Sequence, residues 1–280
     1  MIEGDMRAAL AHAQTVLPGA DSRLEAELLL IHVLDRSRAW LYAHQTDPIN
    51  LEQRMAFDAL LQRRRAGEPI AYLIGCREFW SLRLRVTPAT LIPRAETELL
   101  VECALALIPA DAAWRLADLG TGSGAIALAL ARERPRCRVL ATDVSAAALA
   151  VALHNATALA IPNVEFSMGS WCAALGNERF ALIVSNPPYI AANDAHLRQG
   201  DLRFEPASAL ASGADGLQAI VQIAEQSRER LLPGAWLLLE HGNAQGEAVR
   251  NVLRAAGYRS IETRQDLEQR DRVTLACWDP

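Results

Sequence analysis

The sequence predicts an α/β protein: a Rossmann-like sheet of seven strands with an antiparallel last strand, preceded by a small N-terminal helical domain. Three observations predict this fold. Helical and strand-like segments alternate from about residue 94 to the C-terminus. A glycine-rich turn, Gly120 to Gly124, follows the first of these strands. The stretch before residue 76 instead has apolar residues at helical spacing, so a separate domain of another class is expected there.

Composition and charge narrow the classes of protein that this chain can represent. Its 280 residues are 51% hydrophobic and 22% charged, as is typical of globular chains. The net charge is −5, and neither the first 75 residues nor the rest carries a basic excess, so we expect no direct binding of nucleic acid. The five cysteines form no Cys-x-x-Cys and no metal-like spacing with histidine. We expect free thiols and no metal.

No leader or membrane span is expected. The N-terminus has Glu3 and Asp5 where a signal peptide has basic residues followed by an apolar run. Every apolar stretch is shorter than the roughly 20 residues that a membrane-spanning helix requires. We therefore expect a soluble, cytoplasmic protein. We also expect a monomer.

Residues 1–75 are expected to form the helical domain. Apolar residues at helical spacing predict a first helix over 5–17, stopped by Pro18-Gly19. Ser22 and Glu25 have the spacing of a capping box and predict a second helix through Leu34. Asn50 to Gln53 opens a third helix, which ends at Gly67.

Residues 76–93 are expected to link the two domains. The segment 79–86 alternates apolar and polar residues with a period of two, which predicts a strand or a hairpin. Pro88 and Pro93 punctuate the rest of the linking segment. The second domain is then expected to span residues 94–280.

Seven strands are predicted in the second domain, with helices such as 125–133 and 145–159 between them. Only eight residues, 264–271, separate the last two strands, which is too short for a helical crossover between parallel strands. The final strand should therefore be antiparallel, a feature of Rossmann-like methyltransferases and not of dehydrogenases. The predicted strands are 115–119, 138–142, 164–168, 180–185, 235–240, 258–263 and 272–278.

The glycine-rich turn is the first candidate cofactor site. Glycines allow the backbone to approach a ligand closely, and the helix that follows presents free N–H donors. The candidate residues are Gly120, Thr121, Gly122, Ser123 and Gly124. The same glycines also satisfy the dinucleotide fingerprint, and a tight turn without any ligand is the structural alternative.

Two further residues are candidates for the same site. Asp143 ends the second strand, where a carboxylate can accept hydrogen bonds from both hydroxyls of an adenosine ribose. Its alternative role is the N-cap of the next helix, although Ser145 could also serve as that cap. Trp171 follows the third strand, where it could stack on adenine or belong to the core.

The tetrapeptide Asn186-Pro187-Pro188-Tyr189 is the candidate reacting site, since it follows the fourth strand at the edge where α/β proteins bind ligands. The two prolines stiffen the loop and lack N–H groups. The side-chain oxygen of Asn186 and the carbonyl of Pro187 can accept both hydrogens of a conjugated –NH2 and turn its lone pair towards a sulfonium methyl group. Tyr189 can pack on the planar acceptor group. An ordinary proline-rich loop is the structural alternative.

The tetrapeptide leaves the acceptor open, because the amino group of adenine is planar and conjugated like an amide. An adenine-N6 methyltransferase of nucleic acids is therefore one alternative, although it would need phosphate contacts and base flipping. A non-catalytic module that only binds the cofactor is a second alternative, and a nicotinamide-dependent dehydrogenase is a third.

Several further motifs accompany the glycine turn and the tetrapeptide. With them, the sequence resembles the peptide chain release factor glutamine methyltransferases over nearly its whole length. The motifs are Arg65-Ala66-Gly67-Glu68-Pro69, Glu78-Phe79-Trp80, Leu91-Ile92-Pro93-Arg94, Phe204-Glu205-Pro206 and Glu240-His241-Gly242. Two positions depart from the family pattern: Ala95 replaces a proline, and Ser170 replaces an acidic residue before Trp171.

The resemblance implies a specific reaction and roles for the candidate residues. It implies transfer of a methyl group from S-adenosylmethionine to the glutamine side chain of the Gly-Gly-Gln loop in class-1 release factors. By the same resemblance, Gly120 to Gly124, Asp143, Trp171 and Asn186 would contact the cofactor. Asn186 to Tyr189 would hold the glutamine, and the helical domain would help to dock the release factor.

Overall fold

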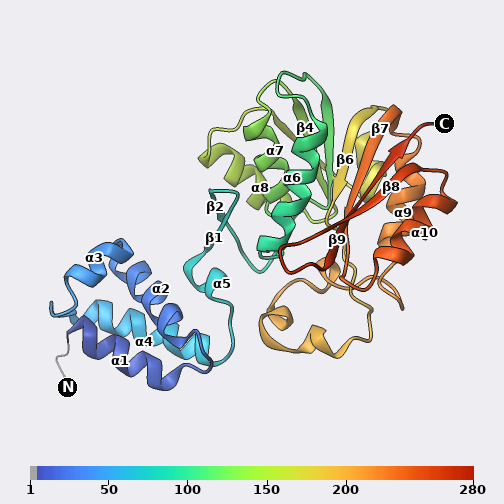
Figure 1. Cartoon of the computed structure of the whole chain (residues 1–280). Helices are drawn as coiled ribbons and strands as arrows, with labels where there is room; N and C mark the ends of the chain where they lie inside the picture. Colours follow the sequence, from blue (N-terminus) through green and yellow to red (C-terminus); the bar gives the residue numbers. More distant parts are fainter. Residues whose placement is uncertain (1–4) are drawn as a thin grey trace. The chain divides into compact units, whose positions relative to one another are not determined.

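Two units with separate hydrophobic cores make up the part of the chain that the computed structural model describes, residues 5–280 (Figure 1). One unit extends to Cys76 and the other begins at Arg77. The linking segment expected at 76–93 begins at the boundary and lies almost wholly in the second unit. None of the helices in the described range is long and apolar enough to span a membrane.

The first unit is helical, and its core holds Leu29, Leu30 and Phe57, each with no exposed surface. The capping box expected at Ser22 is wrong, because Ser22 is already the first helical residue and Asp21 occupies the cap position. A capping box does occur at Asn50, which exchanges hydrogen bonds with Gln53. Two helices too short to show periodicity, α3 and α5, were not predicted. The five helices are α1 (Met6–Val16), α2 (Ser22–Leu34), α3 (Arg38–Ala43), α4 (Leu51–Arg65) and α5 (Ile70–Ile74).

A β-hairpin lies at the start of the second unit. Of the strand and the hairpin predicted for this segment, the hairpin is the one that forms. It consists of β1 (Cys76–Phe79) and β2 (Leu82–Arg85). Trp80 and Ser81 join the two strands with positive φ angles of 51° and 56°. Both central residues of a type I′ turn have positive φ, and this turn suits the twist of a hairpin.

The main sheet has seven strands in the order β5-β4-β3-β6-β7-β9-β8. The strands β3 to β7 pair in parallel, whereas β9 is antiparallel to both of its neighbours. The predicted antiparallel last strand is therefore confirmed. The strands are β3 (Arg115–Leu119), β4 (Arg138–Asp143), β5 (Val164–Met168), β6 (Phe180–Ser185), β7 (Leu231–Glu240), β8 (Arg259–Gln265) and β9 (Asp271–Trp278).

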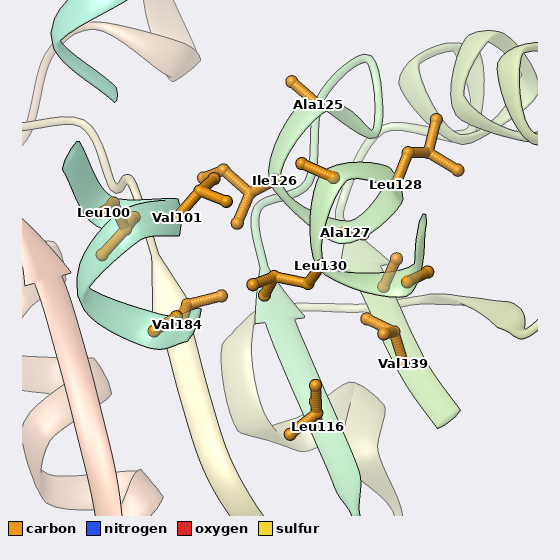
Figure 2. Close-up of a cluster of buried hydrophobic side chains, with 14 of the residues drawn as sticks. Leu100, Val101, Leu116, Ala125, Ile126, Ala127, Leu128, Leu130, Val139 and Val184 are labelled. Atoms are coloured by element: carbon orange, nitrogen blue, oxygen red, sulfur yellow. The ribbon is translucent and has the colours of Figure 1, made fainter. Parts of the chain in front are cut away.

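Helices cover both faces of this sheet, and successive strand residues alternate between two cores. Leu182 and Val184 of β6 belong to one core, and Ile183 belongs to the other. In Figure 2, Val184 lies close to residues of α6 and α7. The helices on that face are α6 (Glu98–Leu107), α7 (Ala125–Glu133) and α8 (Ala146–Ala158), and those on the other are α9 (Gln218–Ser227) and α10 (Gly246–Ala255).

Short 3₁₀ helices complete the second unit. Three of them lie in the long connection from β6 to α9, shown in light orange in Figure 1. Because β3, β4, β5 and β6 are parallel, the segments that follow them meet at one edge of the sheet. The 3₁₀ helices are η1 (Ala95–Thr97), η2 (Trp171–Leu175), η3 (Ala195–Arg198), η4 (Gly200–Phe204) and η5 (Ala207–Ala209).

Candidate active site

A cavity of about 300 Å³ lies at the carboxyl edge of the parallel strands. Segments that follow β3, β4, β5 and β6 all contribute to its wall, as expected at the point where the strand order reverses. The lining residues are Ala89, Thr90, Leu91, Gly120, Gly122, Asp143, Val144, Ser145, Ala148, Gly169, Ser170, Trp171, Asn186, Pro188, Pro206, Ser208 and Ala209.

The glycine turn forms one wall of this cavity. Gly120 and Gly122 line it with φ angles of +74° and +56°, a conformation that side chains with a Cβ rarely adopt. A Cβ on Gly120 would also lie 3.2 Å from the Trp171 ring. Thr121 and Ser123 are buried, and Gly124 precedes α7 with a φ of +86°. The turn therefore presents backbone to the cavity.

Asp118 holds the glycine turn in place through two hydrogen bonds. It was not among the candidate residues. Its Oδ2 accepts hydrogen bonds from Thr121 Oγ1 at 2.6 Å and from the Ala127 amide at 3.2 Å. The side chain is fully buried, and burial raises the pKa of this carboxyl to about 7. One carboxylate thus ties the turn to the first turn of α7.

Asp143 lies in the cavity wall at the end of β4. Its Oδ2 accepts from the Gly122 amide at 2.9 Å, and its Oδ1 accepts from the Ser145 amide at 2.8 Å. The N-cap of α8 is Ser145, whose hydroxyl accepts from the Ala148 amide at 3.2 Å. Since a carboxylate has about four acceptor positions, Asp143 retains capacity for a ligand beyond these two bonds.

Trp171 lies between the core and the cavity. Its ring packs partly against the core and also lines the cavity beside Ser170. Its Nε1 donates to Gln222 Oε1 at 3.2 Å, which holds the indole against the wall. Ser170, the departure from the family pattern, therefore also faces the cavity.

The tetrapeptide lies between this cavity and a smaller one of about 60 Å³. Asn186 lines both cavities, Pro188 lines the larger and Tyr189 the smaller, while Pro187 is buried. The residues around the smaller cavity are Leu91, Arg94, Asn186, Tyr189, Ile190, Leu202, Ala209 and Leu210. Asn186 therefore lines both cavities, as Leu91 and Ala209 also do.

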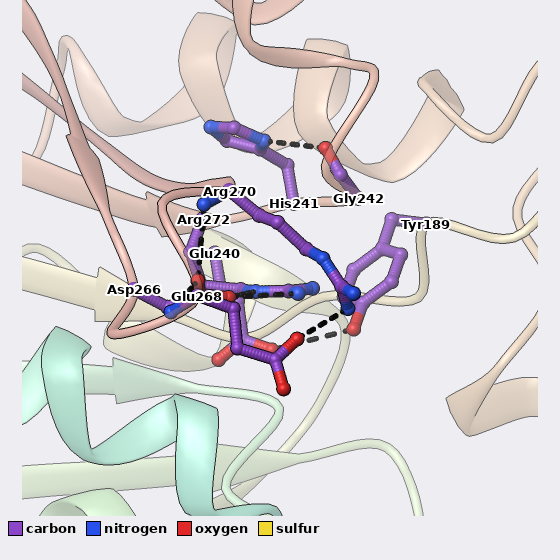
Figure 3. A network of polar contacts seen from close by, with 8 residues as sticks. All are labelled: Tyr189, Glu240, His241, Gly242, Asp266, Glu268, Arg270 and Arg272. Atoms are coloured by element: carbon purple, nitrogen blue, oxygen red, sulfur yellow. Dashed lines mark hydrogen bonds and ion pairs between the residues drawn. The ribbon is translucent and has the colours of Figure 1, made fainter.

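Contacts from distant segments hold the tetrapeptide. Asn186 Nδ2 donates to Thr97 Oγ1 at 3.2 Å. The Tyr189 hydroxyl donates to Glu240 Oε1 at 3.3 Å, as Figure 3 shows, and the Tyr189 carbonyl accepts from Gln245 Nε2 at 3.0 Å. Side chains thus hold both ends of the loop, and an isolated bridge between Ile190 and Ala211 follows it directly.

The environment of Glu240 is unusual for a carboxyl. The side chain is fully buried, and burial raises its pKa to about 7. Burial also raises the pKa of Tyr189, and the neighbouring Glu240 raises it further. Arg272 is a nearby cation, and it pairs with Asp266 at 3.1 Å (Figure 3).

A third buried carboxyl, Glu205, connects the long loop after β6 to the segment before η1. Its Oε2 accepts from the Ile92 amide at 3.0 Å, and its Oε1 forms an ion pair with Arg94. Sequence reasoning gave no role to Glu205, Thr97, Glu240 or Gln245. The quoted motifs were the signal in the sequence for Arg94, Glu205 and Glu240, whereas Thr97 and Gln245 lie in none of them.

Two family comparisons cover most of the chain. The PrmC N-terminal domain family matches residues 8–75, and the methyltransferase small domain family matches residues 95–240. The second match ends at Glu240 and includes the glycine turn and the tetrapeptide.

Similar proteins match over nearly the full length. A release factor glutamine methyltransferase of Xylella fastidiosa (strain Temecula1) is 57% identical over 90% of this chain and 92% of that protein. One from Escherichia coli (strain K12) is 52% identical over 95% of this chain and 96% of that protein. Among solved structures, the 16S rRNA N2 G1207 methyltransferase of T. thermophilus, in complex with AdoMet and guanosine, is 20% identical. It has a TM-score of 0.54 over 72% of this chain and 49% of that one, which shows a shared fold.

Proposed function

This chain belongs to the release factor glutamine methyltransferase family, and we propose that it methylates the side-chain amide nitrogen (N5) of the glutamine in the Gly-Gly-Gln motif of class-1 peptide chain release factors. The observation that carries the proposal is the position of Asn186, a polar residue that lines both cavities. A methyl donor in the larger cavity and an amide in the smaller one would meet at this residue.

The larger cavity fits S-adenosylmethionine as the donor. Gly120 and Gly122 offer a wall without side chains, Asp143 has spare acceptor capacity for ribose hydroxyls, and Trp171 offers a ring face for adenine. A volume of about 300 Å³ lies within the range of small-molecule sites. When bound, S-adenosylmethionine supplies a methyl group on a positively charged sulfur.

The tetrapeptide would orient the acceptor amide. An amide nitrogen is a weak nucleophile because its lone pair is delocalised into the carbonyl. Asn186 Nδ2 already donates to Thr97, which leaves Oδ1 as the acceptor for one N–H of the substrate. The Pro187 carbonyl would accept the other N–H, and Tyr189 and Pro188 would pack on the planar group. These contacts favour the reaction by orientation, without a strong base.

The remaining parts of the proposal concern the partner. The helical unit up to Cys76, whose residues 8–75 match the PrmC N-terminal domain, would help to dock the release factor. A translation factor as substrate makes the cytoplasm the expected location. The proposal also includes a monomer that makes no contact with nucleic acid.

Incubation with methyl-labelled S-adenosylmethionine tests the reaction. A class-1 release factor and duplex DNA are supplied in parallel, and the products are digested and identified by mass spectrometry. We expect label on the glutamine of the Gly-Gly-Gln motif and none on adenine. A release factor whose glutamine is replaced by asparagine is the matched control and should remain unlabelled. Label on adenine alone would overturn the proposal.

A further inference from the structure

The smaller cavity, where the acceptor amide would lie, has a mostly apolar lining. Its apolar residues are Leu91, Ile190, Leu202, Ala209 and Leu210. Three lining residues have polar side chains, namely Arg94, Asn186 and Tyr189, and Arg94 is the charged one among them. An amide that enters this cavity loses contact with water, so its polar atoms need partners on these residues or on the backbone.

The contacts of the proposed function leave one atom of the acceptor amide without a partner. The amide has two N–H donors and one carbonyl acceptor. Asn186 Oδ1 and the Pro187 carbonyl would take the two N–H groups, so the carbonyl oxygen still needs a donor. A buried carbonyl without a donor weakens binding. Because the two ends of an amide are similar in size, the group could then also bind turned round, with its oxygen against Asn186 Oδ1.

The tetrapeptide itself has little left to donate. The Tyr189 hydroxyl uses its hydrogen on Glu240 Oε1, at 3.3 Å. The two prolines have no N–H group. Asn186 Nδ2 donates one of its two hydrogens to Thr97 Oγ1, which leaves a single neutral N–H on this side chain.

Arg94, by contrast, has several N–H groups to spare. Glu205 holds its guanidinium through Oε1, while Oε2 accepts from the Ile92 amide at 3.0 Å. The Glu205 side chain has no exposed surface, whereas 33% of the Arg94 side chain remains accessible. A guanidinium has five N–H donors, and within residues 5–280 Glu205 is the one hydrogen-bond partner of this guanidinium. Its hydrogen bonds are charge-assisted and therefore stronger than those of a neutral amide.

We propose that Arg94 donates to the carbonyl oxygen of the acceptor amide and so selects the orientation in which the –NH2 faces Asn186. This inference rests on the proposed function. The positive charge attracts the carbonyl oxygen and repels the –NH2, so the amide binds one way round. Glu205 keeps the guanidinium at the cavity, because its buried carboxylate links Arg94 to the loop that carries Leu202 and Ala209.

Arg94→Met tests the contact, since methionine fills much of the same space and cannot donate. We expect kcat/KM for the release factor to fall roughly 10- to 100-fold, with the Kd for S-adenosylmethionine changed less than about twofold. Arg115→Met is the matched control, because Arg115 also pairs with carboxylates, Glu165 and Glu178, but lies at the start of β3, away from the glycine turn. Its kcat/KM should equal that of the wild type.

A double variant separates the lost donor from the carboxylate left behind. Arg94→Met leaves Glu205 buried and charged without its cation, which can by itself disturb the loop. Glu205→Gln in the same chain removes this charge, and the new side-chain oxygen can still accept from the Ile92 amide. We expect the double variant to be as slow as Arg94→Met. Recovery to wild-type kcat/KM would overturn the proposal, because the loss would then come from the unpaired carboxylate.

Binding of two release factors tests the contact without catalysis. One factor is unchanged and the other has alanine in place of the glutamine, and the Kd of each is measured by calorimetry with S-adenosylhomocysteine, which has no methyl group to transfer. The ratio of the two Kd values, alanine to glutamine, should be roughly tenfold smaller for Arg94→Met than for the wild type. A purely structural role of Arg94 would weaken both factors alike, so equal ratios would overturn the proposal.

The labelling experiment distinguishes this failure from a failure of the proposed function. Label on glutamine together with equal Kd ratios would reject the role of Arg94 alone. Label on adenine would reject the proposed substrate and, with it, the amide carbonyl that Arg94 is proposed to bind.

Discussion

The two ends of the proposed active site, one for the cofactor and one for the acceptor, are built in different ways. At the cofactor end, Asp118 accepts hydrogen bonds from Thr121 and Ala127, which lie 3 and 9 positions further along the sequence. Asp143 accepts from Gly122, which lies 21 positions before it. At the acceptor end, the tetrapeptide is held from Glu240, Gln245 and Thr97 across 51, 56 and 89 positions. The cofactor end is thus a local structure, whereas the acceptor end depends on the completed fold. Damage to supporting residues should therefore affect kcat more than cofactor binding.

The largest effect is expected from Asn186→Ala, which removes the acceptor atom that both ends of the site share. We expect kcat to fall roughly 100- to 1,000-fold, as when one preorganised hydrogen bond to a reacting group is lost. The Kd for S-adenosylmethionine should rise only a few-fold, because Asp143 and the glycine turn remain. Single-turnover kinetics and calorimetry measure the two quantities. Unchanged turnover would refute the role assigned to Asn186.

Gly216→Ala should act on the acceptor end alone. A Cβ there would lie 2.1 Å from the Tyr189 carbonyl oxygen and 2.8 Å from Gln245 Nε2, so the backbone of Tyr189 has to move. We expect kcat to fall roughly 10- to 100-fold, with little change in the Kd for the cofactor.

Gly234→Ala is the matched control for this substitution. Gly234 has the same φ of +78°, but no described atom lies within 4 Å of its Cβ position. It should show only the backbone strain of about 1 kcal/mol that both variants share. Equal kcat losses in the two variants would show that strain, and not the clash with Tyr189, causes the effect.

Gly120→Ala is the corresponding substitution at the cofactor end. Its Cβ would lie 3.2 Å from the Trp171 ring at the cavity wall, in a backbone conformation with a φ of +74°. We expect the Kd for S-adenosylmethionine to rise roughly tenfold, equivalent to about 1.4 kcal/mol. At saturating cofactor kcat should be nearly that of the wild type. A variant that binds the cofactor normally but turns over slowly would contradict the division between the two ends.

The same division explains which features could be predicted from the sequence. The glycine turn, Asp143 and the tetrapeptide were predicted because each is a short motif at the end of an apolar strand. The seven strands were predicted because apolar runs bounded by turns mark a sheet covered on both faces. The contact of Thr97 with Asn186, and that of Tyr189 with Glu240, were not predicted. Such pairs meet only when η1, β6 and β7 pack together, and no local sequence pattern predicts this packing.

The cap of α8 was left open by the sequence, and it provides the smallest predicted effect. Ser145 caps the helix, whereas Asp143 accepts from backbone amides and faces the cavity. Ser145→Ala should therefore lower the free energy of unfolding by about 1 kcal/mol and leave the Kd for the cofactor almost unchanged. Asp143→Asn, its matched partner, should weaken cofactor binding and leave α8 capped. Denaturant melts and calorimetry on the two variants measure both quantities, and a loss of binding in Ser145→Ala as large as in Asp143→Asn would show that the two roles are not separate.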